Sequence, residues 1–260
     1  MAHGRRTPFS ALTRTAGEVK RYRTYQRIIP AAMGGVAALL VIVYVISVLF
    51  SHYGSFTVVV ENSADKRRFA LSLAESDNFA NPTSRLNSRA VKDITNIDGN
   101  MLPSGLNDED GEHNGEDYVA YTFYVKNVGE EVCDYRYKLA ISKMTAGIDA
   151  AVRLRLYFNP LYYDAQTGEY RYSGDYVDYA KPKSGGNGAP EVDPPGRVMT
   201  NFLSGNTVTE GLIENFVPGS ISRVTVVIWL EGNDPECTDD ILGGEFKMDM
   251  SFEIVDDTVE

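Results

Sequence analysis

Histidine and cysteine, which serve many enzymes and metal centres, are scarce in this chain of 260 residues, with three and two copies respectively. Only His113 lies well inside the C-terminal part, because His3 is near the N-terminus and His52 directly follows the uncharged segment at 28–50. No G-x-S-x-G turn accompanies it, so a Ser-His-Asp hydrolase is not predicted. Residues 113–117 (HNGED) begin like the zinc motif H-x-x-E-H but lack its second histidine. No C-x-x-C spacing offers redox chemistry. We therefore expect a protein that is not an enzyme.

Basic residues are scarce after residue 50. Residues 51–260 hold 18 Lys and Arg against 35 Asp and Glu, a net charge of −17. Affinity for nucleic acid depends on basic side chains that neutralise phosphates, so nucleic acid is not an expected partner. Residues 1–27 have the opposite balance, with seven Lys or Arg and one Glu. The chain therefore divides by charge into a basic tail, an uncharged segment and an acidic domain.

Charge is absent from residues 28–50 (IIPAAMGGVAALLVIVYVISVLF). As an α-helix with a rise of roughly 1.5 Å per residue, this segment would be about 35 Å long, which is enough to cross a hydrocarbon core of roughly 30 Å. The basic tail before it predicts a single-pass protein of the cell membrane, with residues 1–27 cytoplasmic and residues 51–260 extracellular. A cleaved signal peptide is the alternative, although no A-x-A-like site follows the span. Two small-xxx-small spacings in the span also permit a homo-oligomer, at Ala31 with Gly35 and at Gly34 with Ala38.

Helical periodicity is missing outside the span, and alternation of apolar with polar residues takes its place. The clearest case is residues 133–142 (CDYRYKLAIS), and residues 119–125 alternate just before it. Asn127 with Gly129 predicts a turn that joins these two runs as a hairpin. Such alternation is typical of strands with one buried and one wet face.

Further alternating runs bring the number of expected strands to at least seven. One is residues 152–158, where the alternation places Arg153 and Arg155 on the wet face. The others lie at 56–60, 69–73, 224–230 and 246–254. Half-wet sheets must bury their apolar faces against each other, so residues 51–260 predict an all-β domain, an antiparallel β-sandwich of jelly-roll or immunoglobulin-like type. Residues 107–117 and 181–197 read as surface loops, and a short helix is expected at 236–242.

The two cysteines, Cys133 and Cys237, both fall in the predicted extracellular domain, where a disulfide persists. Cys133 points to the apolar face of its strand, which fits either a buried thiol or one end of a bridge to Cys237. Two cysteines do not define a disulfide framework, so both interpretations remain open.

Acidic residues gather in two segments of the domain. Six of them are candidate calcium ligands, namely Asp108, Asp110, Glu112, Asp234, Glu236 and Asp239. Calcium takes six to eight oxygen ligands from flexible loops of this composition. Neither segment has EF-hand spacing, since His113 stands where the motif needs glycine. Solvated acidic loops with no cofactor are the favoured interpretation, because charge runs usually decorate surfaces.

Tyrosines concentrate between residues 157 and 179, where seven of the sixteen lie. Asp164 can open a turn and Gly168 can take its left-handed position, so the flanking residues predict a hairpin. The candidate partner-binding residues are the tyrosines on its two arms: Tyr162, Tyr163, Tyr170 and Tyr172. Aromatic groups of this type bind sugars or partner proteins. A cross-strand ladder that only stabilises the hairpin is the alternative.

Two passages resemble a known family. Residues 124–129 (YVKNVG) and 215–219 (NFVPG), the latter before the strand at 224–230, are similar to the TasA and camelysin family of Gram-positive surface and biofilm-matrix proteins. In that family an N-L-x-P-G-D turn opens a strand, whereas Ser220 stands here in place of Asp. The resemblance implies a jelly-roll-like sandwich on a Gram-positive cell surface, without a classical active site. Residues 228–237 (IWLEGNDPEC) also look like uncharacterised membrane-anchored proteins of such bacteria.

Together these features predict a membrane-anchored β-sandwich with a structural, adhesive or ligand-binding role, whose partner is a cell-surface protein or a glycan. The first alternative is an extracellular carbohydrate-active enzyme that uses a carboxylate pair. The second is a single-pass envelope sensor, although residues 1–27 are too few for a signalling domain.

Overall fold

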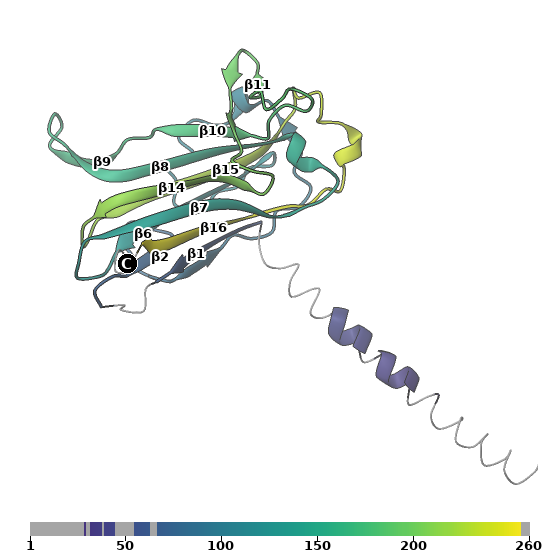
Figure 1. The fold of residues 1–260 in the computed structure, drawn as a ribbon, viewed down its shortest axis with the longest axis horizontal. Coiled ribbons are helices and arrows are strands. Elements are labelled where there is room, and N and C mark those ends of the chain that lie inside the picture. Colours follow the sequence, from purple (N-terminus) through teal and green to yellow (C-terminus); the bar gives the residue numbers. More distant parts are fainter. Residues whose placement is uncertain (1–28, 30–31, 38, 45–54, 63–66, 256–260) are drawn as a thin grey trace, which may run out of the picture. The chain divides into compact units, whose positions relative to one another are not determined.

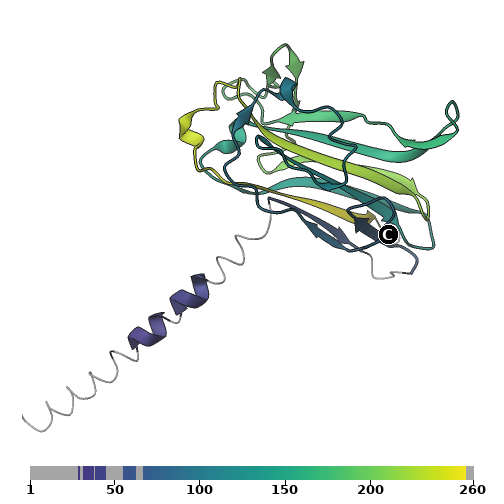
Figure 2. The same ribbon diagram turned by 180° about the vertical axis from the view of Figure 1, so that it is seen from behind.

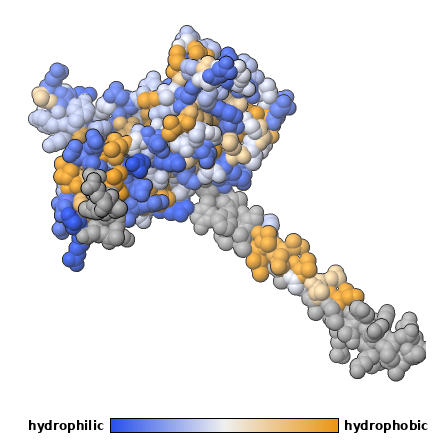
Figure 3. All heavy atoms as spheres, in the orientation of Figure 1, coloured by the Kyte–Doolittle hydropathy of each residue, from blue (hydrophilic) through white to orange (hydrophobic). Residues whose placement is uncertain are grey.

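The computed structural model describes residues 29, 32–37, 39–44, 55–62 and 67–255. They belong to two compact units, Met1–Ser51 and His52–Glu260, which are described separately. In the first unit the described residues are helical, exposed and mostly apolar (Figure 3). Within the described ranges, no helix combines the length and the apolar character needed to cross a membrane. The predicted tail at 1–27 and the rest of the predicted span lie outside the described residues.

The second unit is built from strands, which confirms the all-β class. Five strands form one sheet, in the order β14 (Thr207–Phe216), β7 (Cys133–Met144), β16 (Phe246–Val255), β1 (Phe56–Glu61) and β3 (Arg85–Asn87). Six strands form the main path of a nine-stranded sheet, in the order β13 (Thr200–Asn201), β10 (Tyr176–Ala180), β8 (Val152–Asp164), β15 (Ile221–Glu231), β6 (Tyr118–Asn127) and β2 (Leu71–Ala74). Figures 1 and 2 show the long strands side by side.

Short elements complete the domain. Three strands pair beside the main path of the nine-stranded sheet, namely β4 (Asn96–Ile97) on β15, β5 (Gly111–Glu112) on β6 and β9 (Glu169–Tyr172) on β8. A separate two-stranded sheet joins β11 (Val192–Asp193) to β12 (Arg197–Val198). The three 3-10 helices are η1 (Gly99–Met101), η2 (Ile148–Ala150) and η3 (Asp239–Ile241). The helix expected at 236–242 is therefore only the single turn η3, followed by Gly243 at a φ of 74°.

The core lies between the two sheets and is formed by the apolar residues that alternate along them. Phe123 of β6 packs edge-on against Phe252 of β16, with ring centroids 5.9 Å apart. Tyr137 of β7 stacks on Phe158 of β8 at 4.6 Å. These contacts join the five-stranded sheet to the nine-stranded sheet, so the sandwich is confirmed. Burying two half-apolar faces against each other is the main stabilising contribution in such a domain.

The hairpin predicted between residues 119–125 and 133–142 is wrong. β6 belongs to the nine-stranded sheet and β7 to the five-stranded sheet, so the chain crosses the core between them. Asn127 shapes this crossing, because its Nδ2 donates to the carbonyl oxygens of Glu131 and Phe216 and its Oδ1 accepts from Gly129 N. Alternation marks the apolar face of each strand but does not tell which sheet it joins, since both sheets face the same core.

The expectation of a purely antiparallel sandwich also needs correction. β1 pairs with β16 in parallel over six residues, from Phe56 with Met248 to Glu61 with Glu253. β10 with β13 and β15 with β4 are parallel too. The first long strand of the domain and the last one thus enter the five-stranded sheet from the same end.

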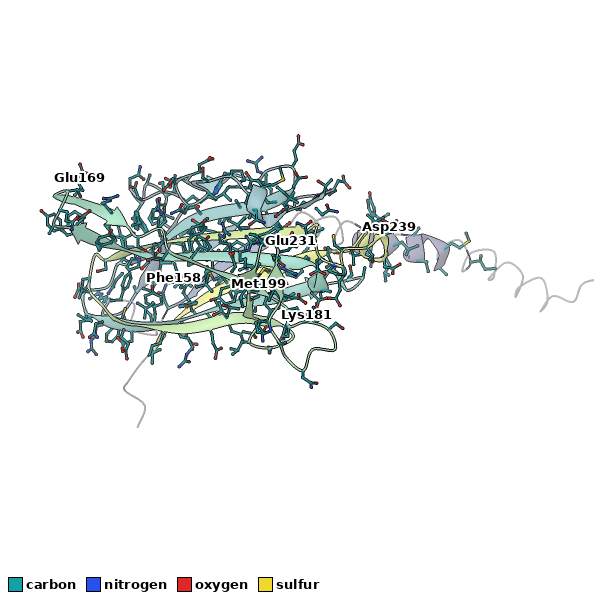
Figure 4. The ribbon with its side chains drawn as sticks, turned by 90° about the horizontal axis from the view of Figure 1, so that it is seen from above. Phe158, Glu169, Lys181, Met199, Glu231 and Asp239 are labelled. Carbon is teal, nitrogen blue, oxygen red and sulfur yellow. The ribbon has the colours of Figure 1, made fainter. Side chains whose placement is uncertain are left out.

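The register of the strands defines two ends of the sandwich. At the β1 end, Phe56 lies near the start of β16, and the loop that carries η3 leads into that strand. β8 runs toward the opposite end and continues past Pro160, its last residue paired with β15, into the hairpin with β9. We call this the hairpin end. Figure 4 shows Glu169 of the hairpin and Asp239 of η3 at opposite ends of the domain.

Candidate functional site

Besides Tyr118 at the start of β6, six tyrosines share the outer face of the nine-stranded sheet, because alternate residues of a strand point to the same side. They come from β6, β8, β9 and β10, and we call them the tyrosine stripe: Tyr124, Tyr157, Tyr163, Tyr170, Tyr172 and Tyr176. Their rings meet in pairs, with centroid distances of 5.4 Å for Tyr163 and Tyr170, 6.0 Å for Tyr124 and Tyr172, and 5.2 Å for Tyr157 and Tyr176.

The hairpin that joins β8 to β9 is confirmed, together with its turn. Gly168 N donates to the carbonyl oxygen of Asp164, and Gly168 takes a φ of 75°, which favours glycine. Tyr163 and Tyr170 lie directly opposite each other with their rings edge to face. They are 57% and 70% exposed, so this aromatic pair is available for contact. On the face seen in Figure 3, apolar residues are dispersed in separate areas rather than gathered into one large patch.

The four predicted binding tyrosines are not one group. Tyr162 lies opposite Arg171 and points to the other side of the hairpin from Tyr163 and Tyr170. Tyr172 is half-buried against Tyr124, and desolvation by this burial raises its pKa to about 12. Of the four predicted binding residues, only Tyr163 and Tyr170 therefore form an exposed pair on one side of the hairpin. Tyr172 lies in the tyrosine stripe but is half-buried.

Arg223 of β15 lies beside Tyr124 and Tyr172, the two tyrosines of the stripe that pack on each other. It lies opposite Tyr124 of β6 on one side and opposite Asn159 of β8 on the other. Its guanidinium carbon is 4.4 Å from the ring centroid of Tyr172, and its Nη2 donates to Asp108 Oδ1 at 3.4 Å. Arg223 Nε and Asn159 Nδ2 are buried donors without a hydrogen-bond partner in the described part of the chain. Neither residue is among the sites predicted from the sequence, although a polar residue in a central apolar strand is a signal of such a site.

A buried ion network lies on the same outer face, toward the β1 end. Arg153 of β8 is fully buried and Arg155 is buried as well, contrary to the wet face that alternation predicts for both. Arg153 Nε donates to both carboxylate oxygens of Asp193 at 3.2 Å, and its Nη2 donates to Asp234. Burial works against the charge of Arg153, but the bonds to the two carboxylates outweigh it and raise its pKa. Segment 181–201 supplies Asp193 and covers the arginine, which the alternation within β8 cannot reveal.

A second part of the network surrounds Trp229. Arg155 Nε and Nη2 donate to the two oxygens of Asp178 at 2.7 and 2.9 Å. Arg197 Nη2 lies 3.5 Å from Glu231 Oε2, which also accepts from Trp229 Nε1 at 3.2 Å. Nearly all of these polar groups have protein partners. The network therefore fixes the segment around β11 and β12 onto the sheet rather than offering an open site.

The six candidate calcium ligands are not brought together. Within the described ranges, no group of three or more His, Cys, Asp or Glu is arranged to hold a metal ion. In the first segment, Asp110 Oδ1 accepts from Tyr124 OH at 2.5 Å and Glu112 Oε2 lies 3.2 Å from Arg89 Nε. In the second, Asp234 belongs to the ion network, whereas Glu236 and Asp239 lie in or beside the exposed segment around η3. Four of the six carboxylates, those of Asp108, Asp110, Glu112 and Asp234, thus serve separate protein contacts.

Cys133 and Cys237 are both free thiols, so of the two interpretations that the sequence leaves open the structure has the unbridged one. Cys133 starts β7 at the hairpin end, near the last residues of β16. Cys237 lies in the loop before β16, at the β1 end. The length of β16 separates them, whereas a disulfide needs Cα atoms within about 7 Å. Burial raises the pKa of both thiols, which keeps them protonated and weakly reactive.

Comparison with known proteins adds no assignment. No protein-family model and no curated protein matches this chain. The geometry itself offers an exposed aromatic pair, a stacked arginine and two unpaired buried donors on one face. Such an arrangement suits recognition of a ligand by stacking and hydrogen bonding.

Proposed function

We propose that this chain is a membrane-anchored cell-surface protein whose β-sandwich binds a cell-surface partner or glycan through the tyrosine stripe. The observation that carries the proposal is the exposed pair Tyr163 and Tyr170, which the hairpin presents beyond the last β8 residue paired with β15. Aromatic side chains lose little conformational entropy on binding and supply a large share of contact energy. The proposed molecular role is therefore binding, which would serve assembly or adhesion at the cell surface.

The position of the hairpin supports this role. With residues 28–50 as the membrane anchor, residues 51–54 are the only link to the domain, and fully extended they reach about 14 Å. Within the domain, the hairpin lies at the opposite end from the start of β1, the first strand after the proposed anchor in the chain. The proposed contact surface is therefore at the end of the domain farthest from its attachment to the anchor.

The family resemblance gains support from a contact between its two motifs. Asn127 Nδ2 donates to the carbonyl oxygen of Phe216 at 2.7 Å, and Gly219 N donates to the carbonyl oxygen of Asn127 at 2.9 Å. From β6 to β7 to β8, and again from β14 to β15 to β16, each strand crosses to the other sheet. That alternation is typical of jelly rolls, so we infer a jelly-roll-type surface protein of the TasA and camelysin kind from a Gram-positive bacterium.

Replacing the exposed aromatic pair tests the binding role. We expect Tyr163→Ser with Tyr170→Ser to reduce retention of the full-length protein on purified cell-wall polysaccharide at least tenfold. Tyr162→Ser, on the other side of the same hairpin, is the matched control and retains binding. Thermal unfolding of all variants checks that the fold survives. Equal retention by the double variant contradicts the proposed site, and release of soluble sugar by the wild type indicates an enzyme instead.

Protease treatment of intact protoplasts tests the anchor and its orientation. The excess of basic residues before the uncharged span predicts that the domain is outside. We expect digestion of residues 55–260 and survival of a membrane-bound N-terminal fragment. Protection of the domain contradicts the orientation, and a mature N-terminus near residue 52 contradicts the anchor.

A further inference from the structure

The unpaired donors beside the tyrosine stripe define a ligand chemistry, and this inference rests on the proposed binding role. Asn159 and Arg223 face each other across β8 and β15 on the outer face. Asn159 is 1% exposed and its Oδ1 already accepts from Ser173 Oγ at 2.7 Å, which leaves Nδ2 as its unused group. Arg223 Nε is likewise buried and has no hydrogen-bond partner among the described residues. Buried donors are nearly always hydrogen-bonded in folded proteins, so these two call for an acceptor.

The surroundings specify the rest of the ligand. A carbonyl oxygen has two lone pairs and can accept from Asn159 Nδ2 and Arg223 Nε together. Asp108 contacts Arg223 by one bond of 3.4 Å and is 71% exposed on its side chain, so its carboxylate can exchange that bond for one from a ligand N–H. The rings of Tyr124 and Tyr172, whose centroids are 6.0 Å apart, add an apolar aromatic surface beside these polar groups. A ligand that fits these groups has a carbonyl oxygen for the two donors, an N–H for Asp108 and an apolar face for the tyrosine rings. An acetamido group has all three features.

Two further features favour a neutral sugar over other carriers of that group. At Arg223, β15 is paired with β8 on one side and with β6 on the other. On its other side β8 lacks a strand partner only over residues 158–160, between the pairs with β10 and those with β9, which is a short edge for an extended peptide. Besides desolvation, Asp77 and Asp110 raise the pKa of Tyr172, and Arg223 lowers it. Together with Asp108, which accepts from Arg223, three carboxylates stand against one guanidinium, which makes the surroundings unfavourable for an anionic sugar. Beyond Tyr172, the same strand carries Tyr170 with its partner Tyr163, which gives further rings to stack on. The geometry points to a binding site for a neutral N-acetylated amino sugar, with its acetamido group at Asn159 and Arg223.

Binding of two matched oligosaccharides to the full-length protein tests this assignment. The probes are β-1,4-linked tetramers of N-acetylglucosamine and of glucose, which differ at the acetamido group, measured by isothermal titration calorimetry in detergent. We expect the N-acetylglucosamine tetramer to bind at least tenfold more tightly. Asn159→Asp replaces the donor by an acceptor of the same shape and should remove that preference while the fold is kept, since Asp can pair with Arg223. Arg223→Met should act in the same way, and Tyr162→Ser should leave the preference unchanged.

The outcomes separate this inference from the proposed function. Equal affinity for the two tetramers, or an unchanged preference in Asn159→Asp, overturns the assignment and leaves the two donors to ordered water. If cell-wall polysaccharide is still retained through Tyr163 and Tyr170 in that case, the proposed function stands without this ligand. If a peptide amide displaces the tetramer from Asn159 and Arg223, the ligand class is wrong. Failure of the wild type to retain any wall material contradicts the proposed function itself.

Discussion

Arg153 shows how far a single residue can depart from its local pattern. Its neighbours in β8 are apolar at every second position, and on that basis it should face water. Instead its side chain is 1% exposed and holds Asp193 and Asp234, whose side chains are 4% and 3% exposed. The covering segment follows some forty residues later in the chain, with Asp193 separated from Arg153 by 40 positions. Nothing in residues 152–158 indicates that a later segment covers Arg153, so the alternation could not predict the ion network.

Removing this arginine should be far more costly than removing an exposed one. Arg153→Met leaves two buried carboxylates without their main partner, and breaking a buried pair in this way costs about 3–5 kcal/mol. Arg171→Met is the matched control, because Arg171 is 52% exposed in its pair with Asp164, and such surface pairs contribute below about 1 kcal/mol. Urea denaturation of both variants gives the two values. Similar losses for the two would show that the Arg153 network does not stabilise the fold.

The positions of the strands can be predicted from the sequence better than their pairing can. The alternating runs correctly placed β1, β6, β7, β8, β15 and β16, because alternation is a local consequence of one buried face. The same runs carried no information on sheet membership, and the hairpin expected between β6 and β7 was therefore wrong. The hairpin of β8 and β9 was predictable because Asp164 and Gly168 specify its turn within a few residues. β14 was missed, since its exposed and partly buried residues follow no strict apolar alternation.

The crossing between β6 and β7 should tolerate no side chain at Gly129. A Cβ there would lie 2.5 Å from Arg68 O and 2.9 Å from Ala70 N, both rigid backbone atoms. We expect Gly129→Ala to lower the free energy of unfolding by about 1–3 kcal/mol through overpacking. Gly205→Ala is the control, because nothing lies within 4 Å of its added Cβ. Chemical denaturation measures both, and equal stability of the two variants would contradict the close approach seen at Gly129.

For the whole molecule, buried tyrosines set an upper limit on the pH at which it stays folded. Desolvation raises the pKa of Tyr172 from 10.0 to about 12, and it also raises the pKa of Tyr118, Tyr124 and Tyr157. The folded state therefore keeps protons that the unfolded chain releases near pH 10. Their contribution to stability is complete below that pH and is lost as the pH rises from about 10 toward 12.

This dependence predicts cooperative alkaline unfolding. Tyrosinate absorbance at 295 nm should rise in two steps, first from exposed tyrosines and then together with loss of the β-sheet circular dichroism signal. Tyr172→Phe removes one contributing group and should move the second step to higher pH, whereas Tyr162→Phe should not. Complete titration of all tyrosines near pH 10 with an intact circular dichroism spectrum would contradict the burial described for the stripe.

The parallel pairing of β1 with β16 has a mechanical consequence for an anchored protein. In the proposed role, a force applied between the start of β1 and a partner held at the hairpin end would act along the strands, because these two points lie at opposite ends of the domain. The six β1 to β16 pairs, and the β3 pairs on the other side of β1, then carry the load in shear, all at once. Peeling them one after another would require a pull across the sheet, which this attachment does not apply. If the proposed function holds, this pairing would let the domain bear tension between a cell and its ligand while β1 stays in the sheet.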